Sequence, residues 1–332
     1  MTRRELLVGL PALSLAGCSR QRAGQERVRL AVAVAPYLVM SGFYLAHELG
    51  YFTQAGLELE IQEVPTAMQT VPLLAGGKLD AAPLTLTPAF INAVASGAKL
   101  RIVAGHAMVS PTCSDRYRVY GSLKAFPRGL NHARQLKGKR VAIFNRGGFL
   151  EFCLDAVLAA AGMSQEDVQV VTLRQPEALA AVASGQVEAM VSHGLDKDLT
   201  LASASIVRGL PLGEVLPEFQ LQFVLFGRRL LEGDPAIGAQ FLGAFMRGDR
   251  EFMRGKTPRF LDDFARRYDL DVKRTREACR NVITPAGEIR LESIQRFIEW
   301  GVKKGYCQRS LAAEQLVDRR FLAVAQELLG RG

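Results

Sequence analysis

The chain contains little cysteine and little histidine, with 5 Cys and 4 His in 332 residues. The histidines do not have the spacing of metal ligands, so we expect no metal site and no other cofactor. Four cysteines follow Cys18, at Cys113, Cys153, Cys279 and Cys307, and their wide spacing is typical neither of a zinc site nor of a dense disulfide framework. We expect isolated buried thiols. An oxidising compartment would allow one bridge, whose pair the sequence does not choose.

Long apolar runs are absent beyond residue 17, so we expect no membrane-spanning helix there. Basic residues form no long run and are not interleaved with aromatic residues, which speaks against nucleic-acid binding. The formal net charge is +9, and residues 247–332 hold 19 Lys and Arg against 13 Asp and Glu. A solvated helical surface explains this excess, and attraction to anionic lipid headgroups or to a membrane partner is the alternative.

Familiar catalytic motifs are missing as well. The sequence has no Gly-rich phosphate loop ending in Gly-Lys-Ser/Thr, no nucleophile elbow and no His-Glu-x-x-His pair. Ser96-Gly-Ala-Lys99 has the Ser-x-x-Lys spacing, but it falls in an expected helix-to-strand turn without companion motifs. These absences favour a binding protein over an enzyme.

The first residues have the layout of an export signal. Arg3 and Arg4 precede an uncharged, mostly apolar stretch from Leu6 to Ala16, which is too short to span a bilayer as a helix. Residues 2–7 also resemble a twin-arginine signal, which would imply export of a folded chain. We therefore expect a signal peptide over residues 1–17.

The end of that segment, Leu15-Ala16-Gly17-Cys18, resembles the lipobox of bacterial lipoproteins. The resemblance implies cleavage after Gly17 and a lipid on the sulfur of Cys18, which would anchor the chain to a bacterial membrane, facing the periplasm or the outside. Polar residues follow at once, and they are typical of a tether, which we place at residues 18–27.

Beyond the tether, one structural unit occurs twice. Apolar runs at residues 29–34 and 140–144 each predict a buried strand, and each is followed by a helix that closes with Ala-Gly plus an aliphatic residue. Further matching segments recur in the same order at a nearly constant offset. Strand, helix, strand, helix, strand in each copy predicts an α/β fold with two similar lobes, each a mostly parallel sheet flanked by helices.

The chain must then return from the second lobe to the first. Leu221–Phe226 reads as a strand, and a helical region begins near Asp234. We expect a two-strand hinge, with crossings near residues 108–120 and 205–222. The predicted divisions are lobe 1 with the C-terminal helices at 28–112 and 218–332, and lobe 2 at 113–217.

Four stretches carry a resemblance to a known group: Phe43–Ile61, Gly77–Ala81, Gln135–Val141 and Ser184–Ala189. They resemble solute-binding proteins of ATP-driven importers in the nitrate, sulfonate, taurine and thiamine-pyrimidine precursor class. The resemblance implies a fold like that of type II periplasmic binding proteins, a small-molecule solute held between the lobes, and a membrane permease as partner. We expect the chain to be a monomer.

Candidate site residues follow from the fold, because ligands of open α/β sheets bind beyond the carboxyl ends of the strands, where helix N-termini favour anions. Asn145-Arg146-Gly147-Gly148 is the leading candidate, since two glycines allow close backbone approach and Arg146 offers a charge-assisted bond to a phosphate, sulfonate or carboxylate. The resembled group places small hydroxyl residues here, so Arg146 speaks against a simple nitrate or taurine ligand. The full candidate set is Tyr37, Ser41, Thr66, Thr85, Thr87, His106, Asn145, Arg146, Gly147, Gly148, Gln175, Ser192, His193 and Asp196.

Several candidates have a structural alternative. Helix capping alone would explain one of Thr85 and Thr87. His106 and His193 fall at expected strand ends in opposite lobes, yet either one also suits a packing role. Tyr37 would either wall the ligand or pack in the core. Arg146 would point into solvent if its segment were a plain start of a helix.

These features predict an extracytoplasmic, lipid-anchored receptor that captures a small solute by hinge closure. We expect a small anionic or aromatic-heterocyclic solute, with sulfonate-like and pyrimidine-like compounds first. One alternative is an enzyme of the same bilobed fold, of the pyrimidine synthase or menaquinone-pathway lyase type, with His106 or His193 as acid–base groups. A sensor lipoprotein is the third possibility.

Overall fold

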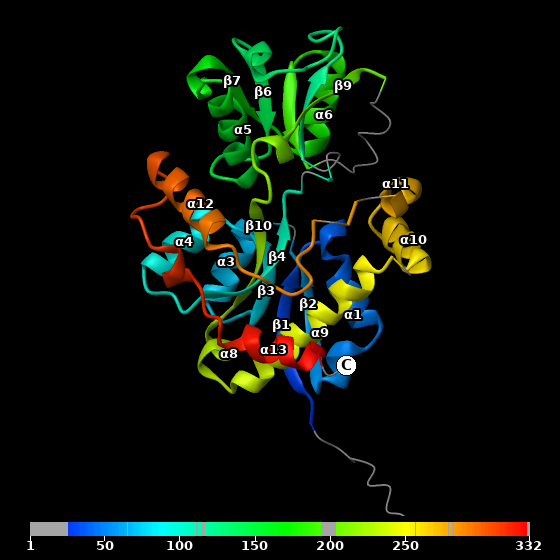
Figure 1. The fold of residues 1–332 in the computed structure, drawn as a ribbon, viewed down its shortest axis with the longest axis vertical. Coiled ribbons are helices and arrows are strands. Elements are labelled where there is room, and N and C mark those ends of the chain that lie inside the picture. Colours follow the sequence, from blue (N-terminus) through cyan, green and yellow to red (C-terminus); the bar gives the residue numbers. More distant parts are fainter. Residues whose placement is uncertain are drawn as a thin grey trace, which may run out of the picture.

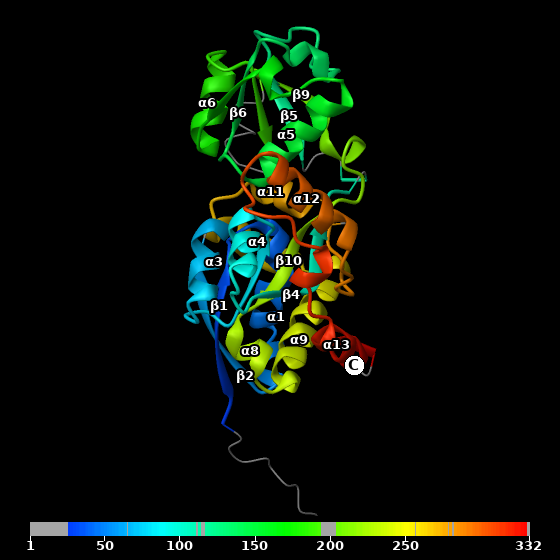
Figure 2. The same cartoon turned by 90° about the vertical axis from the view of Figure 1, so that its left-hand side faces the viewer.

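The chain folds into two lobes, one above the other, as the two orthogonal views in Figures 1 and 2 show. This computed structural model describes residues 26–64, 66–110, 112–113, 117–193, 204–255, 257–277, 279–280 and 282–330. The expected signal peptide, the expected lipid attachment site at Cys18 and the candidate Asp196 lie outside the described residues.

Lobe 1 is built on a sheet whose strand order is β2-β1-β3-β10-β4. Its strands are β1 (Val28–Val34), β2 (Leu57–Glu63), β3 (Ala81–Thr85), β4 (Arg101–Met108) and β10 (Gln220–Phe226). β1 pairs in parallel with β2 and β3, while β10 runs antiparallel between β3 and β4. Its first helices are α1 (Ser41–Glu48), α2 (Tyr51–Gln54), α3 (Ala67–Ala75) and α4 (Pro88–Ala95). The helices after β10 are α8 (Arg228–Glu232), α9 (Pro235–Met253), α10 (Pro258–Arg267), α11 (Val272–Glu277), α12 (Leu291–Lys303) and α13 (Arg320–Gly330).

Lobe 2 repeats this plan with the strand order β7-β6-β8-β5-β9. Its strands are β5 (Arg118–Ser122), β6 (Arg140–Ile143), β7 (Gln169–Thr172), β8 (Ala189–Ser192) and β9 (Ile206–Pro211), and its helices are α5 (Phe149–Ala160) and α6 (Gln175–Ser184). β6 pairs in parallel with β7 and β8, while β5 runs antiparallel between β8 and β9. Short 3-10 turns complete the structure at Leu38–Met40, Ala133–Leu136, Gln165–Asp167, Leu212–Glu214 and Ala313–Leu316.

The predicted fold class is therefore confirmed. Each copy of the repeat is strand, helix, strand, helix, strand, and in each sheet a single strand runs against the other four. Gly56 and Gly162 end the first helical segment of each copy with φ of 79° and 70°, a backbone conformation that glycine adopts at little cost. No helix among the described residues combines the length and the apolar character that a bilayer crossing requires.

The chain passes between the lobes twice, from β4 to β5 and from β9 to β10. Each crossing leads into the antiparallel strand of the sheet it joins, which is fourth in the strand order. The two lobes are therefore linked by two short connections.

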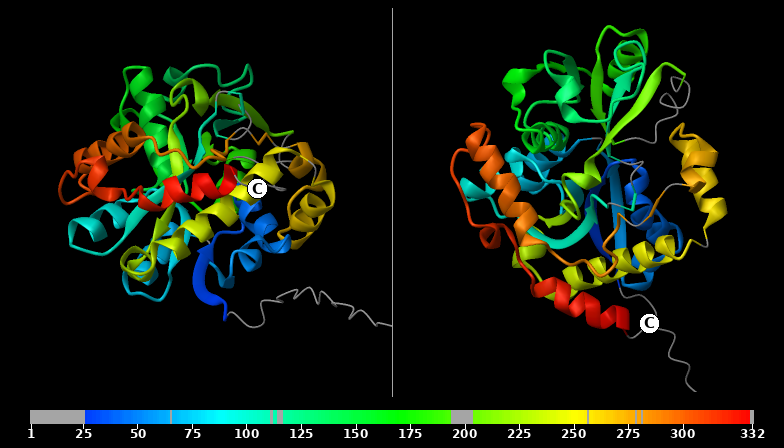
Figure 3. Two further views of the ribbon diagram at one scale, coloured as in Figure 1. Left: turned by 60° about the horizontal axis from the view of Figure 1, so that its bottom comes forward. Right: turned by 45° about the horizontal axis from the view of Figure 1, so that its top comes forward.

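A close helix contact fixes the base of lobe 1. Figure 3 shows α9 with α13 alongside it, and α9 also packs against α1. The contact with α1 depends on Gly42 and Gly248, because a Cβ atom on Gly248 would overlap the carbonyl oxygen of Gly42 and come 2.6 Å from the Cβ of Ala46. Glycine here lets the two backbones approach each other.

We expect Gly248→Ala to lower the free energy of unfolding by about 1–3 kcal/mol, since the added methyl group would force α1 and α9 apart. Gly243→Ala is the matched control on the same helix, because its Cβ would meet nothing closer than 3.7 Å. Urea unfolding of both variants measures the difference. Equal stability of the two would show that the close contact has no energetic role.

The C-terminal region also reaches lobe 2. On α12, Trp300 donates a 2.6 Å hydrogen bond from Nε1 to Asp155 of α5, and Lys304 forms a 3.0 Å ion pair with the same carboxylate. Trp300 packs its ring edge-to-face against Phe152. In Figure 1, α12 and the pair α10–α11 lie on opposite sides of the junction between the lobes. The C-terminal helices therefore flank the space in which a ligand would sit.

Candidate functional site

A cavity of about 770 Å³ lies between the lobes, and segments from both lobes line it. Lobe 1 contributes residues after β1, β2 and β3, and lobe 2 contributes residues after β6, β7 and β8. Leu221 and Gln222 of β10 and Tyr117 of the first crossing add lining from the hinge. The cavity thus lies at the carboxyl ends of the strands, as the α/β pattern predicted.

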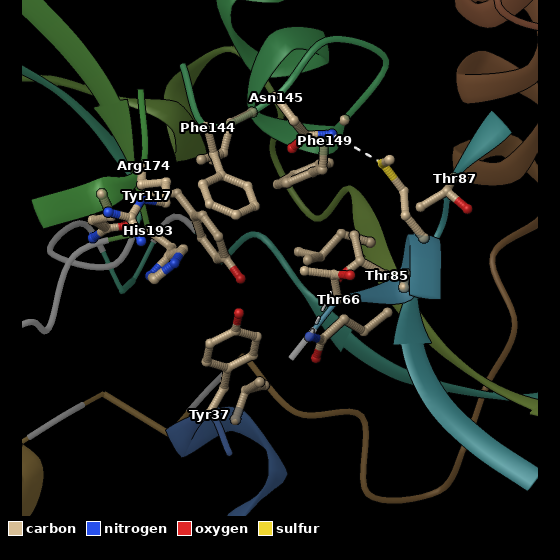
Figure 4. Close-up of a pocket in the computed structure, with 18 of the residues that line it drawn as sticks. Tyr37, Thr66, Thr85, Thr87, Tyr117, Phe144, Asn145, Phe149, Arg174 and His193 are labelled. Atoms are coloured by element: carbon tan, nitrogen blue, oxygen red, sulfur yellow. Dashed lines mark hydrogen bonds between the residues drawn. The ribbon is translucent and has the colours of Figure 1, made fainter. Parts of the chain in front are cut away.

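Eight of the candidates line this cavity. Figure 4 shows the labelled side chains among them converging from opposite sides. The rings of Tyr37 from lobe 1 and His193 from lobe 2 are 5.8 Å apart between centroids, and Asn145 lies 3.7 Å from the sulfur of Met68 on the opposite lobe. The eight are Tyr37, Thr66, Thr85, Thr87, Asn145, Gly148, Gln175 and His193.

Three candidates lie elsewhere because they are buried. Ser41 begins α1 with no exposed surface. Ser192 is also buried, and it accepts a 3.0 Å hydrogen bond from Nε2 of Gln175, so it supports a lining residue. His106 is 1% exposed, with Nε2 3.5 Å from Oδ1 of Asp249 on α9.

The placement of His106 corrects the expected strand end. The sequence predicted that His106 falls at a strand end, but β4 continues to Met108 because Gly105, Ala107 and Met108 pair with β10. His106 therefore lies within the strand, on its core side against α9. Burial raises the pKa of Asp249, although the nearby His106 opposes the shift.

Arg146 and Gly147 were expected to bind the ligand, but both donate hydrogen bonds to Glu151 instead. Arg146 donates from Nη1 to Oε1 of Glu151 at 3.0 Å and to Gln165 at 2.8 Å, and Gly147 donates its backbone N–H to Oε2 of Glu151 at 2.6 Å. Gly147 has φ of 70°, in the left-handed region that favours glycine. Neither residue lines the cavity, so the segment 145–148 reaches it only through Asn145 and Gly148.

Glu151 is the centre of this network. Its side chain is 0% exposed and accepts further hydrogen bonds from Nε2 of Gln165 at 3.1 Å and from the hydroxyl of Tyr306 at 3.0 Å. Burial by itself raises the pKa of Glu151, but the hydrogen bonds from Gly147, Gln165, Arg146 and Tyr306 outweigh it, and the pKa lies below its ordinary value. The start of α5 therefore already holds an anion that belongs to the protein.

The other helix starts at the cavity are capped internally too. Thr66 accepts from the backbone N–H of Gln69 at the start of α3, and Thr87 accepts from that of Phe90 at the start of α4, both at 3.4 Å. At the start of α6, Glu177 accepts from the N–H of Arg174 at 3.2 Å. Thr87 is thus a helix cap as well as a lining residue, while Thr85 lies 3.5 Å from Nε2 of Gln222.

Most of the aromatic residues that line the cavity were not among the candidates from the sequence. The sequence placed Phe144 within the expected strand 140–144, but β6 ends at Ile143, so Phe144 lies in the loop that lines the cavity. Tyr117 lies in the hinge, and its ring packs edge-to-face on Phe149 at 5.8 Å. The segment 268–270, between α10 and α11, carried no local signal, because only the tertiary fold brings it to the cavity.

The cysteines need a correction as well. Cys113 and Cys279 form a disulfide across a sequence separation of 166 residues, so the expectation of isolated thiols is wrong for this pair. It ties the first crossing between the lobes to the segment after α11. Cys153 and Cys307 are free and buried, and burial raises the pKa of Cys307 to about 11. The described residues hold no group of three or more His, Cys, Asp or Glu side chains suited to a metal ion.

The two lobes, the sheet topology and the cavity at the strand ends define the type II periplasmic binding protein fold. Within that class, residues 38–197 match the model of the family described as "NMT1/THI5 like", which confirms the resemblance inferred from the sequence. A search of the curated proteins finds no match to the chain.

Solved structures of three proteins illustrate the shared fold. The alkanesulfonate-binding protein SsuA from Xanthomonas axonopodis pv. citri, bound to MOPS, is 22% identical with a TM-score of 0.69, and the match covers 89% of this chain and 100% of that one. The periplasmic aliphatic sulphonate binding protein SsuA from Escherichia coli is 18% identical with a TM-score of 0.72, covering 88% and 92%. The periplasmic nitrate-binding protein NrtA from Synechocystis PCC 6803 is 14% identical with a TM-score of 0.71, covering 91% and 89%. At these identities the likeness establishes the fold.

Proposed function

We propose that this protein is an extracytoplasmic solute receptor of an ATP-driven importer. The observation that carries the proposal is the cavity between two lobes joined by two crossings, because side chains from both lobes line it. The solute-binding proteins with the same fold support this reading. The resembled group suggests a sulfonate-like or a pyrimidine-like solute.

Hinge closure is the proposed mechanism. A solute that touches both lobes binds the closed form more tightly than the open form, and so shifts the population towards closure. The facing pairs Tyr37–His193 and Met68–Asn145 would clamp it from the two sides. The closed form would then dock on the permease.

The Cys113–Cys279 disulfide supports a location outside the cytoplasm, since disulfides persist in oxidising compartments. In the proposal, export depends on residues 1–17, and a lipid on Cys18 holds the mature chain at the membrane. Residues 18–27 would give the lobes freedom to reach the permease.

We expect Cys18→Ala to release the protein from the membrane fraction, because the variant has no thiol to carry the lipid. Fractionation and immunoblotting of the expressed full-length chain measure this, and globomycin-type inhibition of the lipoprotein peptidase should leave unprocessed precursor. Cys307→Ala serves as the control, since Cys307 is a free, buried cysteine outside the lipobox-like segment. If Cys18→Ala remains in the membrane fraction like the wild type, the proposed lipid anchor on Cys18 is wrong.

A thermal-shift screen of the purified mature chain tests the receptor function itself. A solute that binds only the folded form raises the melting temperature. The panel is nitrate, taurine, methanesulfonate, uracil and quinazoline-2,4-dione. Each stabilising compound is then recovered from the protein, and its molecular mass is measured by mass spectrometry. A receptor returns it unchanged, and a chemically altered compound would favour the enzyme alternative.

A further inference from the structure

We propose that the solute is a planar aromatic or heteroaromatic molecule of at least two rings, held by ring contacts and by neutral hydrogen bonds rather than through a compact oxyanion. This inference rests on the proposed function, which places a solute in the cavity between the lobes. Three features of the cavity support it: its exposed aromatic side chains, the engagement of its charged groups, and its size.

The aromatic side chains come from both lobes and from the hinge. Tyr37 and Phe144 are each 40% exposed, although both belong to the cavity lining. Figure 4 shows the rings of Phe144, Phe149 and Tyr117 close together, with the hydroxyl groups of Tyr117 and Tyr37 pointing toward each other across the cavity. Large apolar side chains left in water are unfavourable, and a flat ring system placed among them would cover their faces.

The charged groups of the lining do not favour an oxyanion. Among Asp, Glu, Lys and Arg, the described part of the lining contains only Arg174 and Asp269. Arg174 is 78% exposed and pairs with Glu177, donating from Nε at 2.9 Å and from Nη2 at 2.5 Å.

The other cation expected to serve an anion, Arg146, is held by the buried Glu151. The same carboxylate accepts the backbone N–H of Gly147, and Glu177 accepts that of Arg174. Two donor groups of the kind that bind anions at helix starts are therefore engaged by the protein's own carboxylates. A compact oxyanion would have to compete with them.

The remaining polar lining is neutral and suits the edge of a heteroaromatic ring. Thr66, Thr85, Gln69, Gln222 and Asn145 offer hydroxyl and amide groups. Such groups both donate and accept hydrogen bonds, so they match a ring edge with alternating C=O and N–H groups. They require no charge on the solute.

The volume of the cavity also favours a solute of at least two rings. At about 770 Å³ the cavity falls within the range of roughly 300–1,000 Å³ that is typical of sites for drug-sized ligands. Nitrate or methanesulfonate would leave most of this space to water and the aromatic faces uncovered. A fused ring system would fill more of it and displace that water.

The test uses two neutral probes with the same hydrogen-bonding edge, uracil and its benzo-fused form quinazoline-2,4-dione, with methanesulfonate as the compact anion. Isothermal titration calorimetry of the purified mature chain is expected to give at least about tenfold tighter binding for quinazoline-2,4-dione than for uracil, because the second ring buries more apolar surface. Methanesulfonate should bind more weakly than either. Tighter binding of methanesulfonate, or no binding of quinazoline-2,4-dione, overturns the inference.

Three substitutions test where the solute binds. Phe144→Ala is expected to weaken quinazoline-2,4-dione about tenfold, through the loss of a ring contact, and to change uracil less. Leu123→Ala is the matched control, since Leu123 is an equally exposed apolar residue of lobe 2 outside the cavity lining. Arg174→Gln is expected to reduce the affinity less than Phe144→Ala does, because Arg174 already pairs with Glu177. A large loss with Arg174→Gln and none with Phe144→Ala contradicts the inference.

The outcomes also separate this inference from the proposed function. If methanesulfonate binds best and is recovered unchanged, the chain remains a solute receptor and the aromatic preference is wrong. If quinazoline-2,4-dione binds best but is recovered chemically altered, the aromatic preference stands and the receptor function fails.

Discussion

Glu151→Gln is expected to lower the free energy of unfolding by about 3 kcal/mol, because the N–H of Gly147 and the side chains of Arg146, Gln165 and Tyr306 lose a shared, buried charged acceptor. Urea unfolding monitored by tryptophan fluorescence measures the change. Since the same carboxylate fixes the segment 145–148, the variant should also bind its solute more weakly.

The control for this experiment is Glu177→Gln. Glu177 likewise accepts a backbone N–H at a helix start and pairs with a nearby arginine, but its side chain is 47% exposed. Water screens such a pair, so the substitution should change stability little. If both variants lose the same free energy of unfolding, the burial of Glu151 does not increase its contribution to stability.

The pH dependence gives a second measure of Glu151. Its pKa is lower in the folded chain than its ordinary value, so the folded state favours the ionised form. The stabilisation is fully present above the unfolded pKa of about 4.3 and is lost as the pH falls through the folded pKa. The stability difference between wild type and Glu151→Gln should therefore shrink on acidification. A stability difference that grows towards low pH would contradict a lowered pKa of Glu151 in the folded chain.

The second large effect concerns the disulfide. Replacing both Cys113 and Cys279 by serine is expected to cost about 2–5 kcal/mol of stability, since the bridge closes a loop across 166 residues of sequence. The bridge also anchors the segment after α11, and residues 268–270 beside that helix line the cavity. Solute affinity should therefore fall together with stability.

A reductant provides the control for that experiment. Dithiothreitol should lower the melting temperature of the wild type and leave the double serine variant unchanged, because the variant has no bridge to lose. If the wild type keeps its melting temperature after complete reduction, shown by mass spectrometry of the alkylated thiols, the bridge contributes no stability.

The sequence correctly predicted the features that depend on residues close together along the chain. Apolar runs identified the strands of both copies, and Gly56 and Gly162 identified the helix ends, because left-handed turns select glycine. The duplicated order then predicted two similar lobes. The strand-end rule brought eight candidates to the cavity without any knowledge of the ligand.

Long-range contacts were beyond such reasoning. Arg146 was expected to bind an anionic solute, but the buried carboxylate of Glu151 holds it, and Tyr306, distant in the sequence, donates to the same carboxylate. His106 was expected at the end of a strand, but it lies within β4 because pairing with β10 extends that strand. Likewise, no local pattern paired Cys113 with Cys279 or brought residues 268–270 to the cavity.

Small-angle X-ray scattering of the purified mature chain, with and without the panel compound that raises its melting temperature most, tests whether the two lobes close around a solute. Closure predicts a smaller radius of gyration with the compound bound, and no such change in a variant with Tyr37 and Phe144 both replaced by alanine. Tight binding to the wild type with no change in its scattering curve would contradict capture by closure of the two lobes.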